Sequence, residues 1–162
     1  MTCPFFVPVF SQVIAMTFTV SDFMTRQVVT VAPDDKLRQA AERMQARGCR
    51  RLPVVEDGRL VGIISDRDVQ LALASPFVLR ERWYDDKLLD ETLVRVCMAL
   101  DVTSVSPETP LIQAAVLMRD RKIGGLPVVE KDQLVGIISE TDMLNALIQL
   151  LIAESASPFT EH

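Results

Sequence analysis

Cysteine and histidine are scarce in this 162-residue chain, which has three cysteines and one histidine. Cys3, Cys49 and Cys97 are odd in number and form no CxxC motif, so the sequence predicts neither a disulfide framework nor a metal site. Unpaired thiols are typical of the cytoplasm, where we expect the protein. The single histidine, His162, is the last residue. Because it cannot complete a Ser-His-Asp or Cys-His arrangement, and P-loop and GxGxxG patterns are missing, we expect no enzyme activity.

Positive charge and long apolar runs are also lacking. The formal net charge is −5, whereas nucleic-acid binders usually carry a basic face, so we expect no nucleic-acid partner. Residues 1–20 carry no charged side chain, but Pro4 and Pro8 interrupt them, which argues against a signal peptide or a membrane span. We expect an N-terminal extension there, whose phenylalanines would pack on another surface such as a second subunit.

An internal repeat organises the chain. The sequence LPVVE at residues 52–56 recurs at 126–130, and LVGIIS at 60–65 recurs at 134–139, each 74 positions later (from 52 to 126 and from 60 to 134). Duplication accounts for this constant offset. The predicted organisation is an extension at 1–19, a first repeat at 20–74, a connector at 75–93, a second repeat at 94–152 and a tail at 153–162.

Each repeat is predicted to follow the order β-α-β-β-α, which makes the fold class α/β, of the α+β type. Apolar residues recur at helical spacing from Leu37 to Met44, and Gly48 marks the helix end. The predicted elements of the first repeat are a strand at 28–31, the helix before Gly48, strands at 52–55 and 60–64 joined by a turn at 56–58, and a helix to about 73. The second repeat is predicted from Val102 to about Leu151, after a partly helical connector that begins at Ser75-Pro76.

The repeated hairpin, followed each time by Ser-x-x-Asp, resembles the CBS-domain family, and the tandem pair resembles a Bateman module over roughly residues 20–74 and 94–150. The resemblance implies two units packed about a pseudo-twofold axis, with two clefts between them. In many relatives these clefts bind AMP, ADP, ATP or S-adenosylmethionine, so we expect a regulatory adenosyl-ligand sensor with no obligatory cofactor and an effector protein that the sequence does not name.

The two Ser-x-x-Asp motifs support two interpretations. Ser65 with Asp68, and Ser139 with Asp142, have the spacing of a helix capping box. By resemblance, the aspartates instead accept the hydroxyls of a ribose and the serines contact the ligand. The resemblance also implies an adenine pocket formed by the start of the opposite repeat, although the same side chains could be ordinary core. The matching positions are Met24, Val28 and Val29 opposite Ser139 and Asp142, and Met98, Val102 and Thr103 opposite Ser65 and Asp68.

Arginines distinguish the two repeats. Arg50, Arg51 and Arg67 all lie near Asp68 in the sequence, and guanidinium groups bind phosphate oxygens well. We therefore predict that the Asp68 cleft binds a phosphorylated ligand. In the second repeat these positions are Gly124, Gly125 and Thr141, of which the glycines could let backbone approach a ligand and Thr141 could contact it.

A module that only dimerises or holds a partner protein is the alternative function. The last predicted helix is apolar over much of its surface, which predicts a homodimer. Its apolar residues are Met143, Leu144, Leu147, Ile148, Leu150, Leu151 and Ile152.

Overall fold

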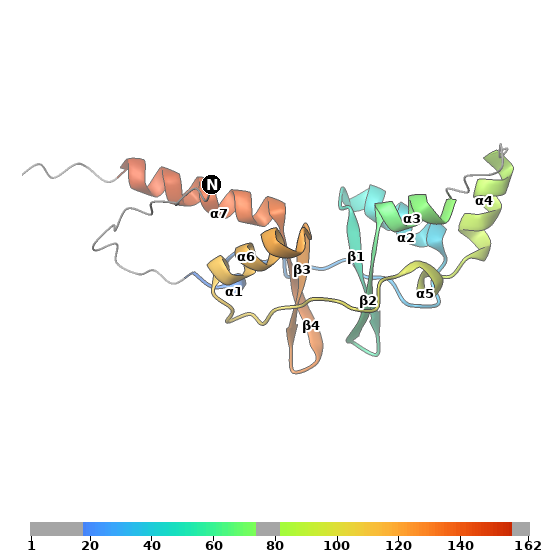
Figure 1. Cartoon of the computed structure of the whole chain (residues 1–162), viewed down its shortest axis with the longest axis horizontal. Coiled ribbons are helices and arrows are strands. Elements are labelled where there is room, and N and C mark those ends of the chain that lie inside the picture. The colour runs from blue at the N-terminus through green and yellow to red at the C-terminus, as the bar shows by residue number, and fades with distance from the viewer. Residues whose placement is uncertain (1–17, 74–81, 157–162) are drawn as a thin grey trace, which may run out of the picture.

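The computed structural model describes residues 18–73 and 82–156. Two β-hairpins lie side by side at the centre of the molecule, and helices pack beyond each hairpin, so that the chain forms two lobes (Figure 1). The hairpins join in one four-stranded sheet of order β1-β2-β4-β3. The fold class is therefore α+β, as predicted. The predictions for residues 1–17, Ser75-Pro76 and His162 lie outside the described residues.

Both repeats contain the predicted helices and hairpin. In the first, the elements are α1 (Val20–Phe23), α2 (Leu37–Arg47), β1 (Arg51–Glu56), β2 (Arg59–Ser65) and α3 (Asp66–Leu73). The connector contributes α4 (Arg82–Glu91), which packs on α2. The second repeat consists of α5 (Val94–Cys97), α6 (Leu111–Arg121), β3 (Gly125–Glu130), β4 (Gln133–Ser139) and α7 (Glu140–Ala156). Helix α7 extends beyond the predicted end near Leu151, because no helix-breaking residue follows before Pro158.

Left-handed residues end α2 and α6 and form the turns of both hairpins. Gly48 follows α2 with φ of 62°, a conformation that glycine adopts without steric cost. Asp57 and Gly58 connect β1 to β2 with φ of 50° and 80°. Lys131 and Asp132 adopt the same conformation in the second hairpin, with φ of 49° and 65°. Two consecutive left-handed residues are typical of the tight turns whose twist matches that of the strands they join.

The first predicted strand of each repeat is reduced to a single parallel bridge, Val31 to Val54 in the first and Val105 to Val128 in the second. The cause is that these segments cross between lobes. Thr25 pairs with Ile137 of β4, whereas Val31 six residues later pairs with β1. The intervening residues span the two hairpins and cannot follow either of them.

Because these segments cross, the first helix of each repeat packs in the lobe that contains the hairpin of the other repeat. Val20 of α1 is fully buried in the core of the second lobe, with Leu126 and Ile138. Val94 of α5 is fully buried in the core of the first lobe, with Leu52 and Ile64. The two lobes are thus interlocked: each is completed by chain from the other repeat.

Glycine permits the close approach of the crossing segments to the hairpins. A Cβ atom on Gly136 of β4 would lie 2.6 Å from Met24 Sδ and 3.2 Å from the Thr25 carbonyl oxygen. A Cβ atom on Gly62 of β2 would lie 2.6 Å from Met98 Sδ and 3.1 Å from the Ala99 carbonyl oxygen. Both contacts are tighter than side chains normally make, so these positions need glycine for space.

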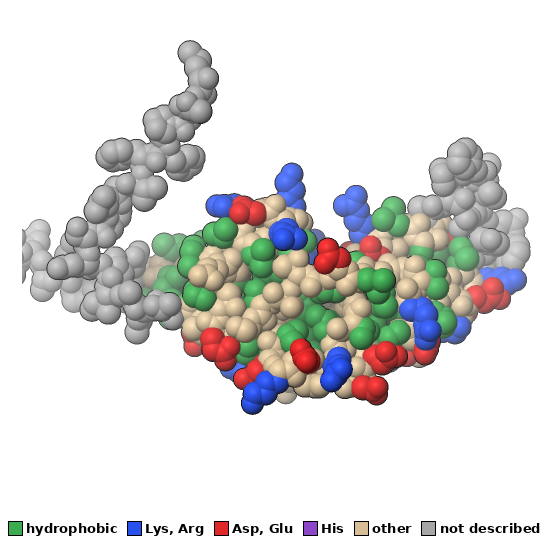
Figure 2. All heavy atoms as spheres, turned by 60° about the horizontal axis from the view of Figure 1, so that its bottom comes forward, with side chains coloured by type: hydrophobic (Ala, Val, Ile, Leu, Met, Phe, Trp, Pro, Cys, Tyr) green, Lys and Arg blue, Asp and Glu red, His purple; other side chains and the backbone are tan. Residues whose placement is uncertain are grey.

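The surface carries both signs of charge. On the face shown in Figure 2, acidic and basic side chains lie mainly around the rim and hydrophobic side chains are exposed in patches toward the middle. This face, as far as its residues are described, has no extended basic patch of the kind that nucleic-acid binders present. Among the described helices, none is long and apolar enough to cross a membrane.

Candidate functional site

A cavity of about 460 Å³ lies between the lobes, where the first crossing segment meets the start of α7. Its volume is within the range of small-ligand sites, roughly 300–1,000 Å³. Both repeats contribute to it, and we call it the Asp142 cleft. Its lining residues are Thr25, Gln27, Val28, Val29, Arg47, Gly48, Cys49, Arg50, Arg51, Pro53, Gly124, Ile137, Ser139, Glu140, Thr141 and Asp142.

The Ser-x-x-Asp motif in this cleft forms a capping box. The Ser139 backbone N–H and hydroxyl donate to Asp142 Oδ2 at 2.7 and 2.6 Å, and the Asp142 N–H donates to Ser139 Oγ at 3.3 Å. The motif in the first repeat has the same geometry, with Ser65 donating to Asp68 Oδ2 at 2.8 and 2.6 Å. The capping interpretation is confirmed for both motifs. Capping engages Oδ2 in each case, so it is compatible with ligand contact through the other oxygen.

The structure brings the predicted adenine wall of the Asp142 cleft together, with one exception. Val28 and Val29 are half-buried and line the cleft with Ile137 of β4. Met24 lies outside the lining and is buried in the core of the second lobe, 8% exposed, against Gly136. Its role is to pack the crossing segment on the hairpin.

The prediction that Arg50 and Arg51 belong to the Asp68 cleft is wrong. Both line the Asp142 cleft, and Arg50 forms an ion pair of 3.6 Å with Glu140 at the start of α7. The backbone of Arg50 lies close to the first Ser-x-x-Asp motif, but its side chain points to the other repeat. The Arg50 carbonyl oxygen accepts from the Asp66 N–H at 3.0 Å, within its own repeat, while the side chain reaches across to the other repeat.

Gly124 makes room for one of these arginines. A Cβ atom at this position would lie 2.6 Å from Arg51 Nη2 and 3.0 Å from the Glu140 carboxylate. The glycine therefore lets the Arg51 guanidinium lie against the backbone of the second repeat. Gly125 is buried at the start of β3, where a Cβ atom would lie 3.4 Å from Arg51 Cδ.

The other residues predicted for the Asp68 cleft do not line the Asp142 cleft. Met98 is half-buried against the core of the first lobe, and Arg67 is exposed on α3. Asp68 influences a cysteine: burial, and after it the Asp68 charge, raises the pKa of the Cys97 thiol. The other predicted residues of this half, all half-buried, are Ser65, Val102 and Thr103.

One arginine missed at the sequence level fixes the wall of the Asp142 cleft. Arg43 Nη1 donates to the Thr30 carbonyl oxygen and to Asp35 Oδ2, both at 2.8 Å. This ties the segment that carries Val28 and Val29 to α2. The second repeat has Leu117 at the matching position, 74 residues later (from 43 to 117), so it has no equivalent of this arginine. A comparison of the two repeats position by position could have revealed this difference from the sequence.

Glu140 and Arg47 were also missed. Glu140 is the x residue of a Ser-x-x-Asp motif, and Arg47 lies at the end of α2. Neither position indicates a site without knowledge of the crossing. Arg47, Arg50 and Arg51 give the cleft three cationic side chains. Glu140 and Asp142 give it two anionic ones. Such a cleft favours a ligand with negative charge. Among the described residues, no group of three His, Cys, Asp or Glu side chains could hold a metal ion.

Comparison with known proteins identifies the repeats. The family model of the CBS domain matches twice, at residues 20–75 and 94–149. The chain belongs to the CBS domain family. A CBS domain-containing protein of Dictyostelium discoideum is 37% identical over 140 residues, which cover 84% of this chain and 95% of the relative.

Solved CBS structures share the fold. AcuB of Vibrio cholerae is 36% identical with a TM-score of 0.74, and the match covers 88% of this chain and all of the other. CBSX2 in complex with AMP is 29% identical with a TM-score of 0.69, and the match covers 83% of this chain and 98% of CBSX2. CBS pairs also occur within enzymes: inosine-5'-monophosphate dehydrogenase of Korarchaeum cryptofilum is 33% identical over 122 residues, only 22% of that protein. The resemblance to it is confined to the CBS pair.

Proposed function

We propose that this CBS pair is a regulatory sensor that binds a phosphorylated adenosyl ligand, such as AMP, ADP or ATP, in the Asp142 cleft. The observation that carries the proposal is the combination of chemistries on its walls. Val28, Val29 and Ile137 offer an apolar surface for a base, and Asp142 offers a carboxylate for ribose hydroxyls. Arg50 and Arg51 offer guanidinium groups for phosphate. The AMP complex of the related CBSX2 supports this class of ligand.

Ligand binding would act on the relation between the repeats. The cleft is lined by chain from both repeats, and the Arg50–Glu140 ion pair joins them at its edge. A phosphate that engages Arg50 competes with Glu140 for the guanidinium. The ligand then favours whichever arrangement of the lobes binds it more tightly, which is the physical basis of a regulatory response.

Calorimetric titration with AMP tests the proposal, with two matched variants. Asp142→Ala and Asp68→Ala remove the same capping box, so each should lose about 1 kcal/mol of folding stability. Only Asp142→Ala should weaken AMP binding, by about 1.5–3 kcal/mol, or roughly 10- to 150-fold in Kd, because it also removes a charged acceptor for the ribose. Equal affinities in the two variants would contradict the assignment of the ligand to this cleft.

Phosphate recognition is tested separately with adenosine. The double variant Arg50→Ala, Arg51→Ala should bind AMP at least tenfold more weakly and adenosine about as well as the wild type, since only AMP presents a phosphate. An equal loss for both ligands would show that the arginines shape the cleft without contacting phosphate.

We also propose that α7 joins two copies of the chain. Leu144, Leu147, Ile148 and Leu151 are all at least half exposed, at 59%, 50%, 53% and 55%. Such a row of apolar side chains on one helix favours association with a matching surface. Light scattering at micromolar concentration should give the mass of a dimer, and Leu147→Asp should give a monomer. A monomer mass for the wild type would reject this assembly.

A further inference from the structure

The Glu140 side chain and two arginines converge at one edge of the Asp142 cleft. Arg50 Nη2 lies 3.6 Å from Glu140 Oε2. A Cβ atom on Gly124 would lie 2.6 Å from Arg51 Nη2 and 3.0 Å from Glu140 Oε2, so both groups meet at this glycine. The Glu140 N–H donates to the Gly124 carbonyl oxygen at 3.2 Å, which holds the start of α7 at the same place. A carboxylate therefore lies where the arginines would receive a phosphate.

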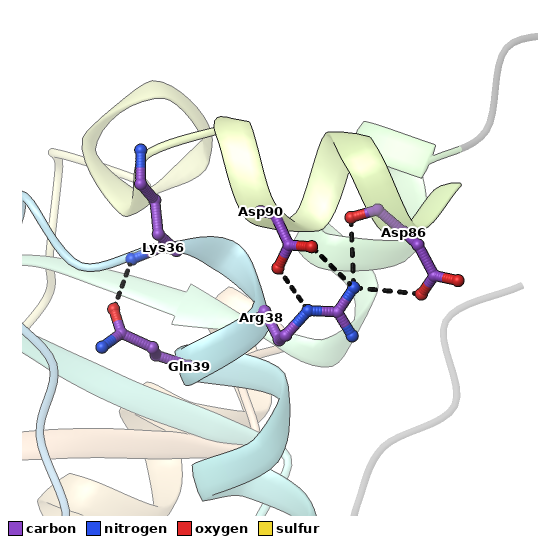
Figure 3. A network of polar contacts seen from close by, with 5 residues as sticks. All are labelled: Lys36, Arg38, Gln39, Asp86 and Asp90. Atoms are coloured by element: carbon purple, nitrogen blue, oxygen red, sulfur yellow. Dashed lines mark hydrogen bonds and ion pairs between the residues drawn. The ribbon is translucent and has the colours of Figure 1, made fainter. Parts of the chain in front are cut away.

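The Arg50–Glu140 pair is loose compared with the arginine cluster of the first lobe. Figure 3 shows Arg38 of α2 held by Asp86 and Asp90 of α4. Its Nη2 donates to the Asp86 carbonyl oxygen at 3.1 Å and to Asp86 Oδ1 at 3.0 Å, and its Nε donates to Asp90, which lowers the pKa of Asp90. Within the described residues, the Arg50 and Arg51 side chains donate no hydrogen bond. Because the Arg50 side chain is also 73% exposed, its guanidinium is open to a ligand.

The first repeat has a carboxylate at the matching position but no arginine beside it. Asp66 stands at the position of Glu140, 74 residues earlier (140 to 66), and Gly124 stands at the position of Arg50 (50 to 124). Asp66 Oδ1 accepts from the Arg67 N–H at 2.8 Å, and in the described part of the chain Asp66 forms no ion pair. The contact between this carboxylate and the arginines is therefore particular to the Asp142 cleft.

The charge of the cleft suits one phosphate better than several. Its three arginines and two carboxylates leave an excess of one positive charge (3 − 2). A phosphate monoester carries about −1.5 to −2 charges at pH 7, which already exceeds that excess. Every phosphate added to the ligand makes it more negative, and the Glu140 carboxylate repels the added charge.

We propose that Glu140 is a specificity-determining residue that makes the Asp142 cleft select a nucleoside monophosphate over the di- and triphosphate. Like charges that face each other disfavour a ligand that would otherwise fit, so the selection works by repulsion. The proposal rests on the proposed function, because Glu140 can discriminate only between nucleotides that occupy this cleft.

The expected discrimination follows from the distances. A phosphate oxygen that accepts from Arg50 at about 2.9 Å lies within about 6.5 Å of Glu140 Oε2, because Arg50 Nη2 is 3.6 Å from that oxygen. One further negative charge at this distance weakens binding roughly threefold in the dielectric of water, or roughly twofold after screening in 0.1 M salt. ATP carries two phosphates more than AMP, so Glu140 should favour AMP by about three- to fourfold.

Calorimetric titrations in 0.1 M salt without divalent cations test the proposal. The wild type should bind AMP more tightly than ATP. Glu140→Gln keeps the size of the side chain and should lower the ratio of the ATP Kd to the AMP Kd about three- to fourfold, with adenosine affinity unchanged. Glu140→Lys should lower this ratio further. The difference between the wild type and Glu140→Gln should disappear in 1 M salt, where the Debye length is about 3 Å, whereas a purely structural role would persist.

Asp66→Asn is the matched control, because it removes the same charge at the matching position of the first repeat. It should leave the ratio of the two Kd values within about twofold of the wild type. If the wild type binds ATP as tightly as AMP, or if Glu140→Gln leaves the ratio unchanged, the role of Glu140 is wrong even where Asp142→Ala weakens AMP binding. If AMP does not bind, or binds equally well to Asp142→Ala, the proposed function fails and this proposal fails with it.

Discussion

Replacing Gly136 by alanine should weaken the interlock between the two lobes. The added Cβ would lie 2.6 Å from Met24 Sδ, 3.2 Å from Met24 Cγ and 3.2 Å from the Thr25 carbonyl oxygen. The thioether can move, but Met24 is only 8% exposed and the carbonyl oxygen is held by the Ile137 N–H at 3.0 Å. Overpacking of this kind costs about 1–3 kcal/mol. Loss of glycine freedom in the unfolded chain offsets about 0.4–1 kcal/mol of it.

The expected result for Gly136→Ala is a net loss of about 1–2 kcal/mol in the free energy of unfolding by urea, or a fall of roughly 2–8 °C in Tm. Shortening the neighbour should relieve the clash, so Gly136→Ala combined with Met24→Ala should cost at least about 1 kcal/mol less than the sum of the single variants. Gly48→Ala is the control, because its Cβ meets nothing within 4 Å and its strain comes from φ alone. It should add to Met24→Ala without coupling. Strict additivity for Gly136→Ala, or a gain in stability, would refute the crowding argument.

Three further predictions concern side chains outside the crossing. Arg43→Leu copies the residue at the matching position of the second repeat. It should speed amide exchange at residues 28–31 and lower the free energy of unfolding by about 1 kcal/mol, because the Thr30 carbonyl loses a charged donor. Unchanged exchange would show that Arg43 does not hold this segment. Arg38→Met should lose stability relative to the wild type at neutral pH. Since Arg38 lowers the Asp90 pKa below its ordinary 3.8, this difference in urea midpoint should shrink as pH falls below about 3.8, and a constant difference would contradict it. Burial raises the pKa of Cys97 above 9.0, so the folded state holds the thiol proton more tightly, and the wild type should lose stability relative to Cys97→Ala as pH rises above 9.0. If the difference in stability between the wild type and Cys97→Ala is the same at pH 8 and pH 10, this prediction is wrong.

Local pattern was enough to predict most of the elements. The helical spacing before Gly48, the turn at 56–58 and the Ser-x-x-Asp caps are short-range features, and each repeat forms them as predicted. The first strand was predicted as a full strand from β-branched residues at 28–31, but only Val31 pairs. Those residues span two lobes, and that fact depends on contacts far apart in the sequence.

The sequence predicted the types of residue in the site, but only partly which residues share one cleft. Val28, Val29, Ser139, Thr141 and Asp142 meet in one cleft, as the family resemblance implied. Arg50 and Arg51 were assigned to the Asp68 cleft because they are close to it in the sequence. Their side chains point across the interface, toward Glu140 and Gly124. Side-chain direction at the end of an edge strand follows from packing between the repeats, which spacing does not encode.

Photolabelling with 8-azido-AMP tests the central claim most directly, because the label reports where the adenine ring binds. The Asp142 cleft predicts modified peptides that contain residues 25–29 or 137–142, protection by excess AMP, and loss of labelling in Asp142→Ala. Asp68→Ala should label like the wild type. A label confined to residues 63–68 or 99–103, still present in Asp142→Ala, would place the ligand in the opposite half of the molecule and contradict the account.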